Sequence, residues 1–220
     1  NHDCLQHIFK QLGIPQDACQ LIDSIYNTAR VQVKGGGVVT DDIPINRGTI
    51  QGDALSPLLF IIFLEAFNRW NHIMSKGYTF SFDNDKKVVS LAYADDCVLM
   101  SESLDDLKEQ AARLQQFVEW AGMKVNIKET AEKSAISAYN PSYIKGKGDA
   151  KFKAQLRTVK YMDRSFPVLL PHQSYKYLGV RICTNLDWSE HKREVFNQIN
   201  ERCSDISNSY CTVLQKQYML

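Results

Sequence analysis

The sequence Val88-Val89-Ser90-Leu91-Ala92-Tyr93-Ala94-Asp95-Asp96-Cys97-Val98-Leu99-Met100 places two adjacent aspartates between two apolar runs. This pattern predicts a tight antiparallel β-hairpin with Asp95 and Asp96 at its tip. Adjacent carboxylates repel each other unless a cation lies between them, and Mg²⁺ takes carboxylate oxygens together with substrate phosphates. The pair therefore favours a metal-dependent phosphoryl-transfer site, although Asp-Asp is also an ordinary turn dipeptide.

A second informative stretch lies about forty residues upstream, where a loop containing Gly48 and Gly52 runs into an apolar helix. Glycine lets the backbone approach a ligand closely, and Gln51 offers both a donor and an acceptor beside it. We expect Ser56 to be the N-cap and Pro57 the first helical residue. The helix is apolar almost all round, which predicts deep burial. A capped buried helix after an incidental glycine turn remains the alternative.

Both stretches resemble motifs of one family. The segment from Gln51 to Phe60 resembles motif B of the reverse transcriptases, and Tyr93 to Asp96 resembles motif C. The order and spacing agree most closely with the non-long-terminal-repeat (LINE-type) retrotransposon polymerases, with group II intron maturases as cousins. Two further segments extend the resemblance: Gly122-Met123-Lys124-Val125-Asn126 is similar to the start of motif D, and Tyr175-Lys176-Tyr177-Leu178-Gly179-Val180 to motif E.

The resemblance implies an RNA-directed DNA polymerase, which joins a deoxynucleoside triphosphate (dNTP) to the 3′-hydroxyl of a DNA primer on an RNA template. It implies two Mg²⁺ ions, or Mn²⁺, with Asp95 as their shared ligand and Asp96 as the more peripheral one. The substrate-binding and template-binding residues that it implies are Gln51, Gly52, Tyr93 and Lys128, and the primer grip is Tyr177, Leu178 and Gly179. Lys128 is a substitute choice, because Glu129 stands where the family usually has the motif D lysine.

One family motif is not found. Motif A carries the first catalytic aspartate, and this chain opens with Asn1-His2-Asp3 and reaches Gly13-Ile14-Pro15, a turn that follows motif A in LINE-type members. A two-metal site needs carboxylates from two elements. We therefore expect the isolated fragment to be inactive as a polymerase. The alternative function is a non-catalytic RNA-binding remnant of the kind found among maturases.

Composition adds weaker constraints. The 220 residues carry a net charge of +1, and the six cysteines show no Cys-x-x-Cys spacing. Neither a zinc site nor a disulfide framework is indicated, and an intracellular location in the cytoplasm or nucleus is expected. No apolar run is long enough to predict a membrane span. The basic stretch from Ile144 to Arg164 favours a solvated linker, with phosphate contact as the alternative. The oligomeric state is left open.

The expected fold class is α+β: a polymerase palm with an antiparallel sheet backed by helices, followed by a truncated helical thumb. We expect residues 1–185 to form the palm with residual fingers elements, and residues 186–220 to begin the thumb. Helices are predicted over residues 3–12, 16–27 and 56–75, after Ser103 and from Trp188. Strands are predicted over residues 31–33, 43–45, 78–82, 87–93, 97–100, 135–138 and 175–182.

Overall fold

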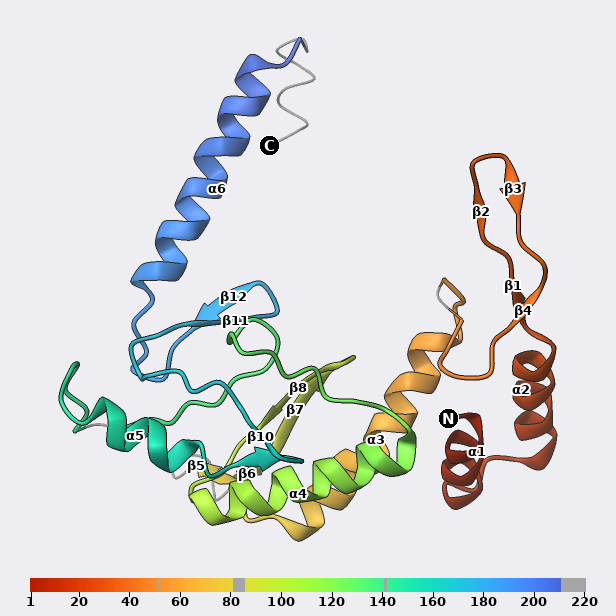
Figure 1. Ribbon diagram of the computed structural model, residues 1–220, viewed down its shortest axis with the longest axis horizontal. Helices are drawn as coiled ribbons and strands as arrows, with labels where there is room; N and C mark the ends of the chain where they lie inside the picture. Colours follow the sequence, from red (N-terminus) through yellow and green to blue (C-terminus); the bar gives the residue numbers. More distant parts are fainter. Residues whose placement is uncertain (51, 81–85, 141, 211–220) are drawn as a thin grey trace. The chain divides into compact units, whose positions relative to one another are not determined.

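The computed structural model describes residues 1–50, 52–80, 86–140 and 142–210 (Figure 1). The chain divides into two compact units. The first comprises Asn1–Val125 and Val159–Arg164, and the second comprises Asn126–Thr158 and Ser165–Leu220. The first contains both loops singled out by motifs B and C, and the second contains the motif E hairpin. The expected boundary between palm and thumb remains a prediction.

Two amphipathic helices open the first unit. Helix α1 (His2–Gln11) begins where the Asn1 side chain accepts a hydrogen bond from the Asp3 amide, and helix α2 (Gln16–Thr28) follows the Gly13-Ile14-Pro15 break. Both helices and the break are as predicted. Spacing by three and four residues puts the apolar side chains of α1 on one buried face: Cys4, Leu5, Ile8 and Phe9.

A two-stranded ribbon follows α2 (Figure 1). Strands β1 (Arg30–Val31) and β4 (Ile43–Pro44) pair at its base, and β2 (Lys34–Gly35) and β3 (Val38–Val39) pair at its tip. Gly36 and Gly37 turn the chain at positive φ, which glycine adopts without strain. The predicted strands near residues 31 and 43 are therefore confirmed, with a second short pair beyond them.

Helix α3 (Ser56–Met74) departs from the prediction in two respects. Leu55, not Ser56, occupies the N-cap position; Ser56 is already helical, and its hydroxyl donates 2.8 Å to the Ile50 carbonyl. Deep burial on all sides is also wrong, because Leu58 and Ile61 are more than half exposed. A helix packed along one stripe buries only the residues three or four apart on that stripe. These are Ser56, Leu59, Phe63, Phe67 and Asn71.

Helix α4 (Leu104–Ala121) covers that stripe, and its Phe117 ring lies 5.5 Å from Phe63 and 5.4 Å from Phe67 between centroids. The predicted start is confirmed, since the Ser103 hydroxyl accepts the Asp106 amide at 3.2 Å. Gly122 ends the helix in the left-handed conformation at φ 67°, as glycine commonly does.

Short antiparallel ribbons stand where one palm sheet was expected. In the first unit β5 (Tyr78–Phe80) pairs with β6 (Lys86–Val88), and β7 (Ser90–Tyr93) pairs with β8 (Asp96–Leu99). The predicted strand over 87–93 is interrupted at Val89, whose side chain is buried in the core with 1% exposed. The α+β class is confirmed, but among the described residues the strands join only in pairs.

The second unit contains α5 (Asp149–Leu156), the β11 (Tyr175–Tyr177) and β12 (Val180–Ile182) hairpin, and α6 (Ser189–Asn208). The hairpin and the last helix are confirmed. The linker prediction is wrong over α5, because Phe152 and Leu156 give this stretch an inner apolar side. The predicted strand over 135–138 is reduced to one bridge between Ile136 and Val168.

Strands β9 (Lys160–Tyr161) and β10 (Arg164–Ser165) complete the described elements. Nowhere in the described part of the chain is a helix both long and apolar enough to cross a bilayer.

Candidate active site

The two aspartates lie at a two-residue turn. Tyr93 pairs with Asp96 as the last rung of the β7–β8 ladder, so Ala94 and Asp95 form the turn itself. Ala94 has φ 49°, a conformation that costs a residue with a Cβ about 1–2 kcal/mol. The turn exposes both carboxylates to solvent. Tyr93 is 68% exposed beside them, so these three predicted site residues are brought together.

Two hydrogen bonds tie the base of this hairpin to the body of the unit. The Met100 amide donates 2.8 Å to the Val89 carbonyl, which closes the ladder below β7 and β8. The Ser90 hydroxyl donates 3.1 Å to the Asn68 side chain of α3. The exposed tip therefore stands on a base that is bonded to a long helix and to a buried valine.

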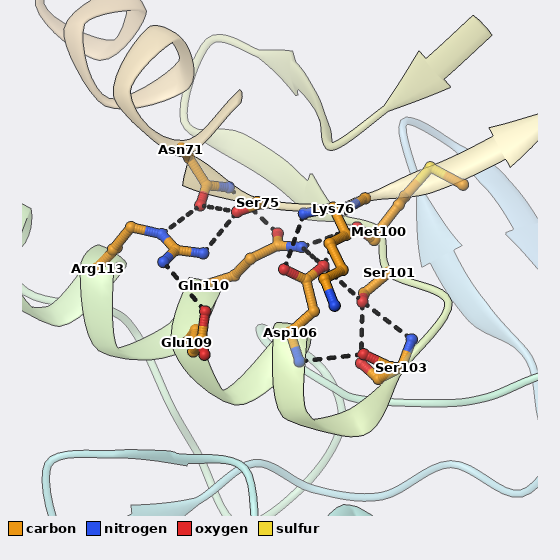
Figure 2. A network of polar contacts seen from close by, with 11 residues as sticks. Asn71, Ser75, Lys76, Met100, Ser101, Ser103, Asp106, Glu109, Gln110 and Arg113 are labelled. Carbon is orange, nitrogen blue, oxygen red and sulfur yellow. Dashed lines mark hydrogen bonds and ion pairs between the residues drawn. The ribbon is translucent and has the colours of Figure 1, made fainter. Parts of the chain in front are cut away.

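A third hydrogen bond connects the hairpin base to a network of buried polar side chains inside the unit (Figure 2). The Gln110 side-chain amide of α4 donates 2.9 Å to the Met100 carbonyl and 3.1 Å to the Asp106 carboxylate. Its oxygen accepts from Asn71 of α3 at 3.1 Å. Because Gln110 is completely buried, its fully used amide fixes the hairpin base relative to both helices.

Asp106 is the acceptor at the centre of this network. Its carboxylate receives the Lys76 and Gly77 amides at 3.0 Å each and the Ser101 hydroxyl at 2.7 Å. Burial by itself raises the pKa of Asp106, but the hydrogen bonds from Ser101, the two amides and Gln110 outweigh it, and the pKa lies below its usual value. The carboxylate is therefore charged and joins the α3–β5 connection to the start of α4.

Arg113 closes the other end of the network in Figure 2. Its guanidinium donates 3.1 Å to Asn71 and 2.6 Å to the Ser75 hydroxyl, and lies 3.6 Å from Glu109. Sequence reasoning missed these residues as supports of the site. The available signal was polar residues at positions on the buried faces of two helices, namely Asn71 in α3 and the Asp106–Gln110 pair in α4.

The motif B loop is held at both ends. The His2 ring donates from Nε2 to the Gly48 carbonyl at 2.8 Å, and the buried Tyr26 hydroxyl lies 3.2 Å from that of Ser56. Gly52 has φ 91°, and a Cβ placed on it would meet nothing within 4 Å. The loop backbone is therefore open to an approaching ligand. Gln51, the other predicted residue, lies outside the described residues.

The predicted primer-grip and lysine residues lie in the second unit. Tyr177 pairs with Val180, and Leu178 and Gly179 form a turn with φ 48° and 83°. Lys128 is exposed in an irregular segment.

The motif E hairpin is bound to α6 by ion pairs. Lys176 reaches Glu194 at 2.7 Å, and Arg181 also bonds to that carboxylate. The hydrogen bonds from Lys176 and Arg181 hold the pKa of Glu194 below its usual value. The predicted grip turn is therefore carried by a hairpin that is fastened to the last helix.

The donor set at the hairpin tip fits a hard divalent cation in part. Carboxylate oxygens are the ligands that Mg²⁺ prefers, and Asp95 and Asp96 offer two such groups in one turn. Among the described residues no cluster of three or more His, Cys, Asp or Glu forms a complete metal site. The pair therefore supplies part of a coordination sphere, with other ligands to come from substrate phosphates, water or another carboxylate.

Comparison with known proteins agrees with this arrangement. Residues 1–182 match the family described as reverse transcriptase (RNA-dependent DNA polymerase), and the chain belongs to that family. The predicted resemblance to the reverse transcriptase family is thereby confirmed, and this family generally uses divalent metal ions.

Two similar relatives are Retrovirus-related Pol polyproteins from the type-1 retrotransposable element R2 of Popillia japonica. They are 29% and 27% identical over 181 residues, which is 82% and 81% of this chain. The matched stretch spans 28% and 24% of the relatives' own length. These relatives agree with the retrotransposon assignment made from the motifs.

Proposed function

We propose that this chain is the palm portion of a retroelement RNA-directed DNA polymerase. The substrates would be a dNTP, a DNA primer and an RNA template. The observation that carries the proposal is the Asp95–Asp96 turn on its anchored hairpin in a chain of the reverse transcriptase family. The domain assignment that goes with it is palm over residues 1–185 and the beginning of a thumb over residues 186–220.

In the proposed reaction the primer 3′-oxygen forms a bond to the α-phosphorus of the dNTP, and the bond to the pyrophosphate leaving group breaks. Asp95 and Asp96 would supply part of the carboxylate set that holds two Mg²⁺ ions, which would neutralise charge on the transferring phosphoryl group when bound. Tyr93 would lie against the terminal primer nucleotide. The open backbone at Gly52, together with Gln51, would face the templating base or the incoming nucleotide.

The remaining predicted residues would act on the nucleic acid and the leaving group. The turn of Tyr177, Leu178 and Gly179 would grip the primer end, and Lys128 would donate a proton to pyrophosphate. We further propose an intracellular setting. The cysteines of the described residues are all free, namely Cys4, Cys19, Cys97, Cys183 and Cys203, as expected in a reducing compartment.

The test is primer extension by the full polymerase that contains this chain, with Asp95→Ala and Asp96→Ala as variants. Loss of a shared metal ligand should raise the activation free energy by about 4 kcal/mol, which lowers the rate of extension about 10³-fold. Asp42→Ala is the matched control, because its exposed carboxylate in the ribbon contacts only Gln32 among the described side chains. RNA binding is expected to persist in all three variants.

Extension at near the parent rate by Asp95→Ala would refute the assignment of the metal ligand. Binding of RNA without extension by the parent protein would instead favour the non-catalytic, maturase-like function. The two outcomes are separated by measuring binding and extension on the same preparation.

A further inference from the structure

The segment from Lys145 to Arg157 carries an excess of positive charge in the second unit. Five cations and one carboxylate, Asp149, fall within it. We call the five cations the basic surface: Lys145, Lys147, Lys151, Lys153 and Arg157. Lys145 and Lys147 lie in the turn before α5, Lys151 and Lys153 lie in the helix, and Arg157 is its C-cap. All of them except the half-buried Lys153 are exposed.

Some cations of the chain have a printed acidic partner among the described residues, and others have none. Lys176 and Arg181 are both bonded to Glu194, and Arg69 is paired with Glu65 at 2.8 Å. By contrast, no side chain of the basic surface forms an ion pair or hydrogen bond with the described residues. With five cations and the one carboxylate of Asp149, the segment has a net charge of +4 within thirteen residues, so an anionic partner would relieve the repulsion among the cations.

The one carboxylate of the segment is engaged elsewhere. Asp149 accepts the Tyr143 hydroxyl at 2.9 Å, and that hydroxyl also lies 3.3 Å from Nδ1 of His172. The Tyr143 ring contacts Phe152 at 5.9 Å between centroids. These contacts join the turn to the helix, so the cations of both lie on one ordered element.

Helix geometry spreads the cations over the outer side of α5. At 100° per residue, Phe152 and Leu156 mark the inner side, and Lys153 and Arg157 share one flank while Lys151 lies on the other. Between the two flanks lie Ala150 and Ala154, which are exposed and small. A strand can therefore approach the helix backbone closely between Lys153 and Arg157 on one flank and Lys151 on the other.

We propose that the basic surface binds the phosphodiester backbone of a nucleic-acid strand outside the candidate active site. The spacing of charges around small residues suits successive phosphates, which Lys and Arg neutralise with release of counterions. An anionic membrane is a poorer match, because interfacial helices expose an apolar face and the larger apolar residues of α5 lie on its inner side. The proposal rests on the proposed function only in expecting that strand to be template or primer.

The experiment measures binding of a fluorescent 20-nucleotide single-stranded RNA to the full polymerase by anisotropy, over a series of salt concentrations. The variant replaces all five cations of the basic surface with glutamine. The control replaces five cations spread over α1, α4 and α6, so that the net charge changes equally: Lys10, Lys108, Lys192, Arg193 and Arg202. A third variant replaces the four lysines of the basic surface with arginine.

The dependence of log K on log salt is expected to fall by about 0.7 for each phosphate that the variant no longer neutralises, up to about 3.5 for five. The scattered control and the arginine variant should retain the parent slope. The same measurement with a DNA strand of the same sequence shows whether the basic surface binds RNA, DNA or both. Equal slopes for the basic-surface variant and the scattered control, with both folded by circular dichroism, would overturn the proposal. Binding of the surface to phosphatidylserine vesicles but not to RNA or DNA would overturn it as well.

Primer extension separates this inference from the proposed function. Asp95→Ala should abolish extension and leave the salt slope unchanged, whereas the glutamine variant should change the slope. A retained slope in the glutamine variant together with loss of extension in Asp95→Ala would refute the basic surface alone.

Discussion

Replacement of Asp106 by asparagine should destabilise the first unit strongly, although the two side chains have the same shape. One Asp106 oxygen accepts the Lys76 amide, and the other accepts the Gly77 amide, Ser101 and Gln110. Whichever oxygen becomes an NH₂ group then faces a donor. A hydrogen bond to a charged group contributes about 1.5–3 kcal/mol, and a buried unpaired donor costs about 1–3 kcal/mol. We expect the free energy of unfolding to fall by about 2–4 kcal/mol.

The neighbouring Asp105 provides a matched control for this measurement. Its side chain is 90% exposed and pairs only with Lys108 among the described residues. Such exposed helix pairs contribute about 0.3–0.5 kcal/mol. In urea unfolding of the chain followed by circular dichroism, Asp106→Asn should lower the midpoint by about 1–2 M for a slope near 2 kcal/mol per M. Asp105→Asn should lower the midpoint by only about 0.2 M. Equal midpoints for the two variants would refute the role given to the network.

The same carboxylate predicts a pH dependence. Because hydrogen bonding lowers the pKa of Asp106 in the folded state, its stabilisation is fully present above the unfolded value of about 3.9 and is lost as pH falls through the folded value. The parent should therefore lose more stability than Asp106→Asn between pH 5 and the acid limit of the folded state. Parallel curves of unfolding free energy against pH would contradict the lowered pKa.

Three further substitutions test other parts of the fold. Gly77→Ala should lower the free energy of unfolding by at least about 2 kcal/mol in a thermal unfolding measurement, because a Cβ there would lie 2.7 Å from the Val88 carbonyl oxygen. Gly37→Ala is the control and should lower it by only about 1 kcal/mol, the cost of its left-handed backbone. Val89→Ala should lower the free energy of unfolding by about 2 kcal/mol, because its side chain is buried. Val38→Ala, whose side chain is 69% exposed, should lower it by under about 0.5 kcal/mol, and equal losses would argue against the buried hairpin base. Glu194→Gln should lower the thermal midpoint at low salt and less at 1 M NaCl, since salt screens ion pairs that are partly exposed. A loss independent of salt would speak against those pairs.

Local patterns were enough to predict the elements whose physical cause is local. The α1 and α2 helices follow from apolar spacing and from the Gly13-Ile14-Pro15 break, and the start of α4 follows from the Ser103 cap. The stretch around motif C predicted both the hairpin and the position of Asp95 in its turn, whereas Asp96 directly after it is the first residue of β8. Each of these depends on residues within a few positions of one another, so their sequence alone carries the necessary information.

Tertiary structure decided what depends on distant partners. Nothing near Leu58 in the sequence shows that this side of α3 is exposed while Phe63 and Phe67 meet Phe117 from a helix about fifty residues away. Likewise, Asp106 and Gln110 look like surface residues of α4 until the Gly77 turn and Met100 are folded against them. The sequence by itself therefore predicted the candidate site residues, and it determined the turn that presents Asp95. Only the tertiary structure determined which buried hydrogen bonds hold that turn, because a polar side chain is stable inside a protein only when the fold brings its partners to it.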